Sequence, residues 1–163
     1  TGAIAVALLT ERTNGLGVAV DISEEALQCA AGNAARAGVA GRLLCVRGDY
    51  CAALGRGFDW IISNPPYIAS AVVEGLGAEV RDHDPRRALD GGIDGLDAYR
   101  SIIAQARGCL NVNGRIALEI GFDQADAVAA LLGDYGFFAI EIIQDLGGND
   151  RVLVARRYKK QAF

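Results

Sequence analysis

The sequence has few of the residues that hold metals or form disulfides. Among its 163 residues are one histidine, His83, and four cysteines, and no two cysteines are spaced as Cys-x-x-Cys. We therefore expect free thiols, no metal site and a cytoplasmic setting. The sequence also lacks an apolar run of 18 residues and a signal-peptide pattern, so we expect no membrane contact.

Basic residues are not in excess. The 16 lysines and arginines are outnumbered by 20 acidic residues, which gives a net charge of −4. A chain with this balance has no basic footprint for a phosphate backbone, so we expect no stable binding of nucleic acid. Hydrophobic residues make up 52% of the chain, which is enough to form the core of one domain.

Methionine is absent, and the chain opens on Thr1–Ala5, which is typical of the second half of a glycine loop that enters a helix. We therefore expect the chain to be part of a longer protein, with the first strand of its sheet missing before Thr1. We predict one N-terminally truncated domain over residues 1–157 and a solvated tail over residues 158–163.

Helical and strand patterns alternate along the chain, which predicts a doubly wound, Rossmann-like α/β fold. The patterns predict helices over residues 3–11, 24–37, 97–110 and 124–135, and strands over residues 17–20, 43–46, 58–63, 115–120, 139–143 and 151–155. The apolar runs 17–20 and 60–63 are typical of buried strands of a mostly parallel sheet. The last two strands predict an antiparallel hairpin. Ser23 and Asp97 are predicted helix caps, and the irregular segment 68–95 is predicted to be a lid or a substrate loop.

The loop Asn64–Tyr67 follows a predicted strand directly, where a parallel sheet presents its functional edge. The side-chain oxygen of Asn64 and the carbonyl of Pro65 can each accept an N–H. Neither Pro65 nor Pro66 has an N–H that competes, and their rings stiffen the loop. Tyr67 adds a flat face on which a planar group can stack. The loop therefore suits an –NH2 group on a planar π-system, although a tight Pro-Pro turn without function has the same sequence.

Two aspartates follow earlier strands of the predicted sheet. The carboxylate of Asp21 can accept both hydroxyls of a ribose, although it could also cap the following helix. Asp49 could accept the exocyclic amine of adenine with Tyr50 beside the base, or it could be an ordinary turn residue. Gly2 would let the backbone approach a ligand. Because the ends of parallel strands meet at one edge, we expect these residues to line one crevice with Asn64.

Two cofactors carry such a nucleoside: a nicotinamide dinucleotide and S-adenosylmethionine. Hydride transfer needs no double acceptor for an –NH2 group, whereas methylation of an amide or of an aromatic amine does, because the delocalised lone pair makes the nitrogen a poor nucleophile. Two accepted hydrogen bonds and stacking would position that nitrogen. The Asn64 loop therefore favours S-adenosylmethionine.

The sequence resembles the HemK-type protein-glutamine methyltransferases, which modify peptide chain release factors. The resemblance covers nearly the whole chain. It depends on these segments: Thr1–Ala5, Ala19–Asp21, Asn33–Ala34, Gly48–Asp49, Ser63–Ile68, Pro85–Arg86, Ala88–Leu89, Gly91–Leu96, Leu118–Gly121 and the hairpin from Asp145 to Val152. DNA adenine and ribosomal RNA guanine methyltransferases share the Asn-Pro-Pro-Tyr loop, but Ala88–Leu96 is more particular to the glutamine enzymes.

The resemblance implies a methyltransferase that uses S-adenosylmethionine, releases S-adenosylhomocysteine, and modifies N5 of the glutamine in a Gly-Gly-Gln motif of a release factor. The residues expected to contact the cofactor are Thr1, Gly2, Asp21, Ile22, Asp49, Tyr50 and Asn64. Those expected to hold the glutamine amide are Asn64, Pro65, Pro66 and Tyr67, and of these Asn64, Pro65 and Tyr67 are the expected catalytic residues. The chain departs from the family at Asp84, where glutamate is expected, and it lacks the first strand and the N-terminal helical domain.

Two other functions are compatible with the same residues. A nucleic-acid methyltransferase acting on adenine N6 or guanine N2 would have to reach a flipped or unpaired base. The acidic charge balance disfavours it, and the nearby Arg81, Arg86 and Arg87 are expected to pair with local aspartates. The second alternative is a catalytically inactive domain of the same fold that binds other proteins. His83 is expected to be a surface residue rather than a general base.

Overall fold

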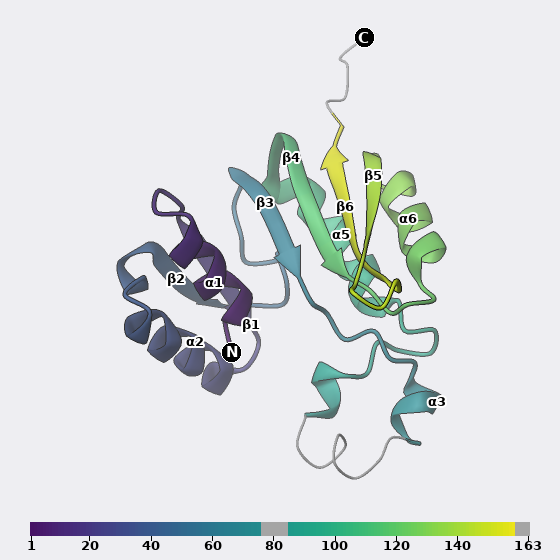
Figure 1. Ribbon diagram of the computed structural model, residues 1–163, viewed down its shortest axis with the longest axis horizontal. Coiled ribbons are helices and arrows are strands. Elements are labelled where there is room, and N and C mark those ends of the chain that lie inside the picture. The colour runs from purple at the N-terminus through teal and green to yellow at the C-terminus, as the bar shows by residue number, and fades with distance from the viewer. Residues whose placement is uncertain (76–84, 159–163) are drawn as a thin grey trace. The chain divides into compact units, whose positions relative to one another are not determined.

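The computed structural model describes residues 1–75 and 85–158. It divides into two compact units, Thr1–Leu54 and Gly55–Phe163, and each unit has its own sheet (Figure 1). The predicted tail is described only at Tyr158. Within the described residues, no helix is both long enough and apolar enough to span a bilayer.

The first unit is a βαβ arrangement preceded by a helix. It contains α1 (Ala3–Glu11), β1 (Gly17–Asp21), α2 (Glu24–Arg36), the 3₁₀ helix η1 (Ala40–Arg42) and β2 (Leu43–Arg47). Strands β1 and β2 are parallel, and their register runs from Gly17 opposite Leu43 to Asp21 opposite Arg47. The predicted cap of α2 is confirmed, because Ser23 Oγ accepts the N–H of Ala26 at 3.2 Å.

The core of this unit is small, and hydrogen bonds between its elements add to the apolar contacts. Its main buried apolar cluster is Leu9, Ala34 and Val39, with Val6 and Leu43 packed against it, and Ala30 and Cys51 are also buried. The Arg42 guanidinium donates to the carbonyl oxygens of Leu9, Arg12 and Gly15 at 2.6, 2.8 and 3.1 Å. Carbonyls at the end of a helix have no partner within the helix, so Arg42 satisfies the end of α1 from 27 or more residues away in sequence.

The second unit is a mixed sheet with two helices packed on it. It contains β3 (Phe58–Ser63), α3 (Ser70–Val73), the 3₁₀ helix η2 (Arg86–Ala88), α5 (Asp97–Cys109), β4 (Leu110–Glu119), α6 (Ala125–Asp134), β5 (Phe137–Gln144) and β6 (Asp150–Arg157). The strand order is β3-β4-β6-β5 (Figure 1). β3 and β4 are parallel, whereas β6 is antiparallel to both of its neighbours. The predicted fold class and its C-terminal antiparallel hairpin are therefore confirmed.

The core of the second unit lies between this sheet and helices α5 and α6. Helix α5 packs on β4 and against α6, and α6 packs on β5 and β6. The largest fully buried side chains come from α5, α6, β6, β4 and the residue after β4: Tyr99, Ile102, Ile103, Leu110, Ile116, Leu118, Ile120, Val128, Leu132 and Leu153. Burial of this apolar surface is the main favourable term that stabilises the unit.

The predicted burial of two strands is wrong. Every residue of β1 is only partly buried, and in β3 Trp60 and Ile62 are 45% and 39% exposed while Ile61 is buried. Side chains alternate between the two faces of a strand, and β3 lies at the edge of its sheet. An unbroken apolar run therefore indicates a strand here without indicating burial on both faces.

Two local predictions also need correction. Asp97 is the first residue of α5 and not its cap; Leu96 precedes the helix, and Asp97 Oδ1 instead accepts from Arg100 at 2.9 Å. Asn113 and Gly114 do not precede a strand but lie within β4, which already begins at Leu110. The register between β3 and β4 shifts there, and Asn113 has a φ of 64°, so the strand that was predicted to begin at Arg115 begins earlier and is irregular before that residue.

Candidate active site

The loop Asn64–Tyr67 leaves the carboxyl end of β3, as predicted. Ser63 pairs with Leu118 in the parallel register, so the loop begins beside the end of β4 at Glu119. Pro65 is buried and Asn64 is exposed. In the part of the chain that the structure describes, the Asn64 side chain has no intramolecular hydrogen bond. Its oxygen is therefore available to a ligand.

Hydrogen bonds from distant segments fix the end of this loop. The carbonyl of Tyr67 accepts from Gln124 Nε2 at 3.0 Å. The N–H of Ile68 donates to Leu89 O, and Ile68 O accepts from Gly91 N, at 3.0 and 2.8 Å. The end of the loop is thus hydrogen-bonded to Leu89 and Gly91, which lie in the segment 88–96 on which the predicted resemblance depends.

A glycine permits the close approach of that segment. Gly95 has a φ of 75°, and a Cβ atom there would lie 2.4 Å from the Tyr67 carbonyl oxygen. Only glycine reaches this backbone conformation without strain while leaving room for the carbonyl. Within the glycine-rich sequence 91–95, Gly95 is therefore required for the segment to pack against the Tyr67 carbonyl.

Asp90 holds the same segment through three hydrogen bonds. Its Oδ1 accepts from Ser70 Oγ at 2.6 Å and from Gly92 N at 3.0 Å, and its Oδ2 accepts from Arg86 Nε at 3.1 Å. These bonds, with that from Ser70 first, lower the pKa of Asp90 below its usual value. The expected local pairing is confirmed for Arg86, which also lies 3.8 Å from Glu74. Two further aspartates near these arginines, Asp82 and Asp84, lie outside the described residues, as do Arg81 and His83.

Asp90 should make the stability of this segment depend on pH. Because its pKa is lower in the folded state than in the unfolded chain, its contribution is complete above the unfolded value, about pH 4, and is lost as the pH falls through the folded value. We expect Asp90→Ala to lower the midpoint of thermal unfolding at pH 7 and to change it less at pH 2.5. Calorimetry at the two pH values measures this, with Glu11→Ala, a change at an exposed carboxylate, as the control. Equal shifts at both pH values would contradict the assignment.

Two groups near the loop were missed in the sequence. Tyr99 is 0% exposed, and its hydroxyl donates to the carbonyl of Glu119 at 2.9 Å, with Gln124 Oε1 at 3.3 Å. Burial, followed by the charges of Tyr67 and Glu119, raises the pKa of Tyr99, so its hydroxyl remains a donor. Tyr99 and Gln124 were assigned to helices from periodicity, which carries no information about hydrogen bonds to a loop.

In the first unit, Asp21 and Asp49 follow neighbouring parallel strands. Asp21 ends β1; its Oδ1 accepts the N–H of Ser23 at 2.9 Å, and its carbonyl accepts from Gly48 N at 3.1 Å. One carboxylate oxygen of Asp21 therefore accepts a local N–H, but Asp21 does not cap α2, because Ser23 is the cap of that helix. No hydrogen bond to Oδ2 is present among the described residues, so this oxygen remains available to a hydroxyl group.

Apolar and aromatic groups flank these aspartates. Ile22 is 49% exposed, and its carbonyl accepts from Arg47 Nε at 3.2 Å. Asp49 is exposed and Tyr50 is partly buried. Burial, followed by the charge of Asp49, raises the pKa of Tyr50, which keeps its hydroxyl neutral. An exposed apolar side chain beside two acidic acceptors suits a nucleoside, so these residues fit the cofactor predicted from sequence.

Thr1 and Gly2 lie at the start of α1 and are held against α2. Thr1 O accepts from Asn33 Nδ2 at 2.8 Å. Gly2 has a φ of 69°, and a Cβ atom at this position would lie 2.6 Å from the Cβ of Ala30. The glycine is therefore required both for the left-handed backbone and for the close approach of the two helices.

Substituting Gly2 tests that packing directly. We expect Gly2→Ala to lower the free energy of unfolding by about 1–3 kcal/mol, because the added methyl group overlaps Ala30 and φ is positive. Ala30→Gly removes the overlapping group but not the φ strain. We therefore expect the loss of unfolding free energy in the double variant to be smaller than the sum of the losses in the two single variants. Urea unfolding followed by circular dichroism measures these free energies. Strict additivity would show that the helices do not meet at these atoms.

The predicted site residues belong to two units. Thr1, Gly2, Asp21, Ile22, Asp49 and Tyr50 lie in the first unit, and Asn64, Pro65, Pro66 and Tyr67 in the second. Their convergence in one crevice remains a prediction.

Comparison with known proteins gives a consistent result. A family profile described as the methyltransferase small domain matches residues 1–80. A solved methyltransferase from Pyrococcus furiosus superposes on 96% of this chain and 70% of its own, with a TM-score of 0.69 and 17% identity. The chain therefore has the fold of the S-adenosylmethionine-dependent methyltransferases.

Proteins with similar sequences indicate a particular family among these methyltransferases. The chain is 48% identical to a release factor glutamine methyltransferase of Agrobacterium fabrum over 96% of this chain and 54% of that protein. It is 46% identical to the protein of that name from Rhodospirillum rubrum, over 96% and 48% of the two chains. The chain thus spans about half the length of the curated relatives it matches. It is homologous to the release factor glutamine methyltransferases over nearly its whole length, and the resemblance predicted from sequence is confirmed.

Proposed function

We propose that the protein transfers a methyl group from S-adenosylmethionine to the side-chain amide N5 of the glutamine in the Gly-Gly-Gln motif of peptide chain release factors. Two findings support this. The relatives named for that activity share 46–48% of the aligned residues. The single structural observation that carries it is the Asn64–Tyr67 loop at the carboxyl end of β3, where the Asn64 oxygen is left without a partner among the described residues.

The loop supplies what a carboxamide nitrogen needs. Asn64 Oδ1 and Pro65 O would accept the two N–H groups of the glutamine amide, and the ring of Tyr67 would stack on its plane. These contacts orient the nitrogen lone pair, and the two carbonyl dipoles favour the positive charge that develops on nitrogen during transfer. S-adenosylmethionine, when bound, supplies the electrophilic methyl group and leaves as S-adenosylhomocysteine, and the proton lost from nitrogen passes to water.

The first unit would hold the cofactor. Asp21 would accept the ribose hydroxyls through the oxygen that Ser23 leaves available, and Asp49 would accept the adenine amine between Ile22 and Tyr50. The backbone at Thr1 and Gly2 would approach the rest of the cofactor, and Asn64 is a further proposed cofactor contact. No metal is required in this scheme. We further propose that residues 1–157 act as one methyltransferase domain in the cytoplasm, followed by the tail 158–163, with release factors as protein partners and no stable contact with nucleic acid or membrane.

Label transfer tests the proposed function. The purified protein is incubated with methyl-labelled S-adenosylmethionine and, in separate reactions, a release factor, the same factor with the Gly-Gly-Gln glutamine replaced by alanine, duplex DNA and ribosomal RNA. We expect label only on the unmodified release factor. Label on a nucleic acid would indicate an amine methyltransferase of that substrate. Binding of the release factor without transfer would indicate an inactive interaction domain.

A further inference from the structure

Gln124, the residue that precedes α6, joins several segments of the second unit that are far apart in sequence. Its Nε2 donates to Tyr67 O at 3.0 Å and lies 3.4 Å from Gly95 O. Its Oε1 accepts from Gly121 N at 3.0 Å and lies 3.3 Å from the Tyr99 hydroxyl. One partly buried side chain therefore contacts the substrate loop, the glycine-rich segment, the end of β4 and helix α5.

We propose that Gln124 is a positioning residue of the carboxamide site, which fixes the Asn64–Tyr67 loop through the Tyr67 carbonyl. This inference rests on the proposed function and adds a residue that acts on the substrate only through the loop. The amide group suits the task because it has donors on one atom and an acceptor on the other. Its donors contact the Tyr67 carbonyl of the loop and the Gly95 carbonyl of the glycine-rich segment, while its oxygen accepts from Gly121 after the end of β4.

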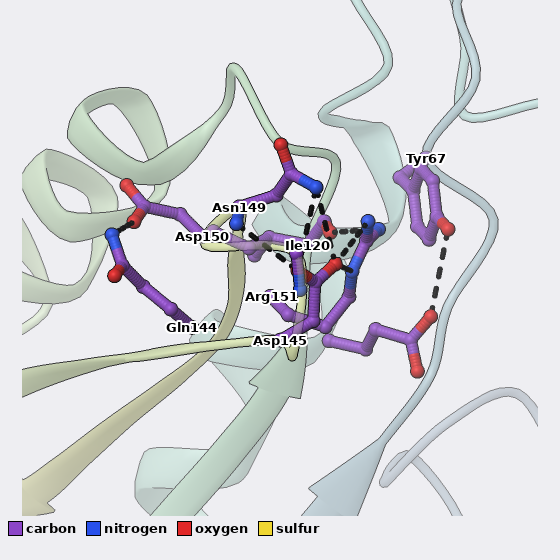
Figure 2. A network of polar contacts seen from close by, with 9 residues as sticks. Tyr67, Ile120, Gln144, Asp145, Asn149, Asp150 and Arg151 are labelled. Carbon is purple, nitrogen blue, oxygen red and sulfur yellow. Dashed lines mark hydrogen bonds and ion pairs between the residues drawn. The ribbon is translucent and has the colours of Figure 1, made fainter.

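The hydroxyl end of Tyr67 lies beside charged groups of the same unit. It donates to Glu119 Oε1 over a long 3.5 Å contact (Figure 2). Arg151 NH1 donates to Ile120 O at 3.2 Å, and Arg151 NH2 pairs with Asp145 at 3.1 Å (Figure 2). The hydrogen bonds that Arg151 donates to Asp145, followed by the charges of Tyr67, Asp145 and Glu119, raise the pKa of Arg151. Of the contacts at the two ends of Tyr67, the bond from Gln124 is the shorter and better formed.

Loss of the two donors on Gln124 should move the loop rather than unfold the unit. Gln124→Glu keeps the shape of the side chain and its acceptor for Gly121 N–H, and a negative charge before the first turn of α6 is favourable to the helix. The new carboxylate cannot donate to Tyr67 O or Gly95 O and repels both. Displacement of a reacting group by about 1 Å can reduce the rate by about 10²-fold.

The test combines turnover with hydrogen exchange. For Gln124→Glu we expect kcat for release factor methylation to fall at least tenfold and affinity for S-adenosylmethionine by calorimetry to stay within threefold. We expect exchange of the Asn64, Tyr67 and Ile68 amides, the ones with an N–H in residues 64–68, to accelerate. The matched control is Val128→Ala, one turn further along α6, where Val128 is 0% exposed. This variant should lose stability while it retains kcat and the loop exchange rate of the unsubstituted protein.

The outcomes separate this inference from the proposed function. Faster exchange with unchanged kcat would overturn the positioning role and leave the methyltransferase activity intact. Unchanged amide exchange in Gln124→Glu would show that Gln124 does not hold the loop, and would also overturn the positioning role. If the unsubstituted protein labels no release factor, the proposed function fails, and the exchange of residues 64–68 still shows whether Gln124 holds the loop. A kcat that falls equally in Val128→Ala would indicate general destabilisation and would also overturn the inference.

Discussion

Asn64→Ala is expected to reduce methyl transfer to the release factor by about 10²–10³-fold, the loss seen when one positioned polar group that stabilises a transition state is removed. The side-chain oxygen of Asn64 is one of two acceptors that would hold the amide nitrogen, and the Pro65 carbonyl cannot orient an –NH2 group alone. Affinity for S-adenosylmethionine should stay within a few-fold, because most of the expected cofactor contacts lie in the first unit. Rates from label transfer and affinities from calorimetry measure the two effects.

Asn111→Ala is the matched control for this prediction. Asn111 lies on β4 at the opposite end of the same strand pair, where its Nδ2 donates to Asp59 Oδ1 at 2.8 Å and to Gly57 O at 3.2 Å. Its replacement removes an asparagine and two hydrogen bonds without reaching the loop, so we expect near-normal kcat. If Asn64→Ala retained full turnover, or if both variants lost it equally, the role assigned to Asn64 would be wrong.

Asp21→Asn is expected to weaken S-adenosylmethionine binding by about 10–100-fold. The substitution keeps an oxygen to accept the Ser23 N–H, which Asp21 Oδ1 accepts at 2.9 Å. It replaces the other oxygen with an –NH2 group that cannot accept from a ribose hydroxyl. A hydrogen bond to a charged group contributes about 1.5–3 kcal/mol, and every 1.4 kcal/mol corresponds to a factor of ten in affinity. Calorimetric titration with the cofactor measures the change.

The control for Asp21 separates its two roles. Ser23→Ala removes the cap of α2, which should lower the free energy of unfolding by about 1 kcal/mol and leave cofactor affinity nearly unchanged. Asp21→Asn should weaken cofactor binding and leave the free energy of unfolding nearly unchanged. If Asp21→Asn bound the cofactor normally, Asp21 would be a structural turn residue, and the ribose would have to be assigned to another acceptor.

Much of the fold could be predicted because its signals are local. Ser23 caps α2, as the sequence indicated, and Gly38 follows the last turn of that helix with a φ of 71°. The Asn-Pro-Pro-Tyr loop follows β3 because a strand-forming run meets two prolines that cannot continue a sheet ladder. Burial was predicted less well. Trp60 is 45% exposed, with the Arg115 guanidinium 5.2 Å from its ring centroid, because edge position is decided by pairing and not by the run itself.

The amino-acid sequence by itself determined the element order, the class of fold and the position of the Asn64–Tyr67 loop after its strand. Each of these depends on side-chain period, on backbone restriction by proline and glycine, or on motifs a few residues long. Only the tertiary structure brought Gln124 to the Tyr67 carbonyl and Arg42 to the end of α1. Hydrogen bonds between a side chain and a distant backbone segment produce no periodic pattern in the sequence, because they form only after packing has placed the two segments together.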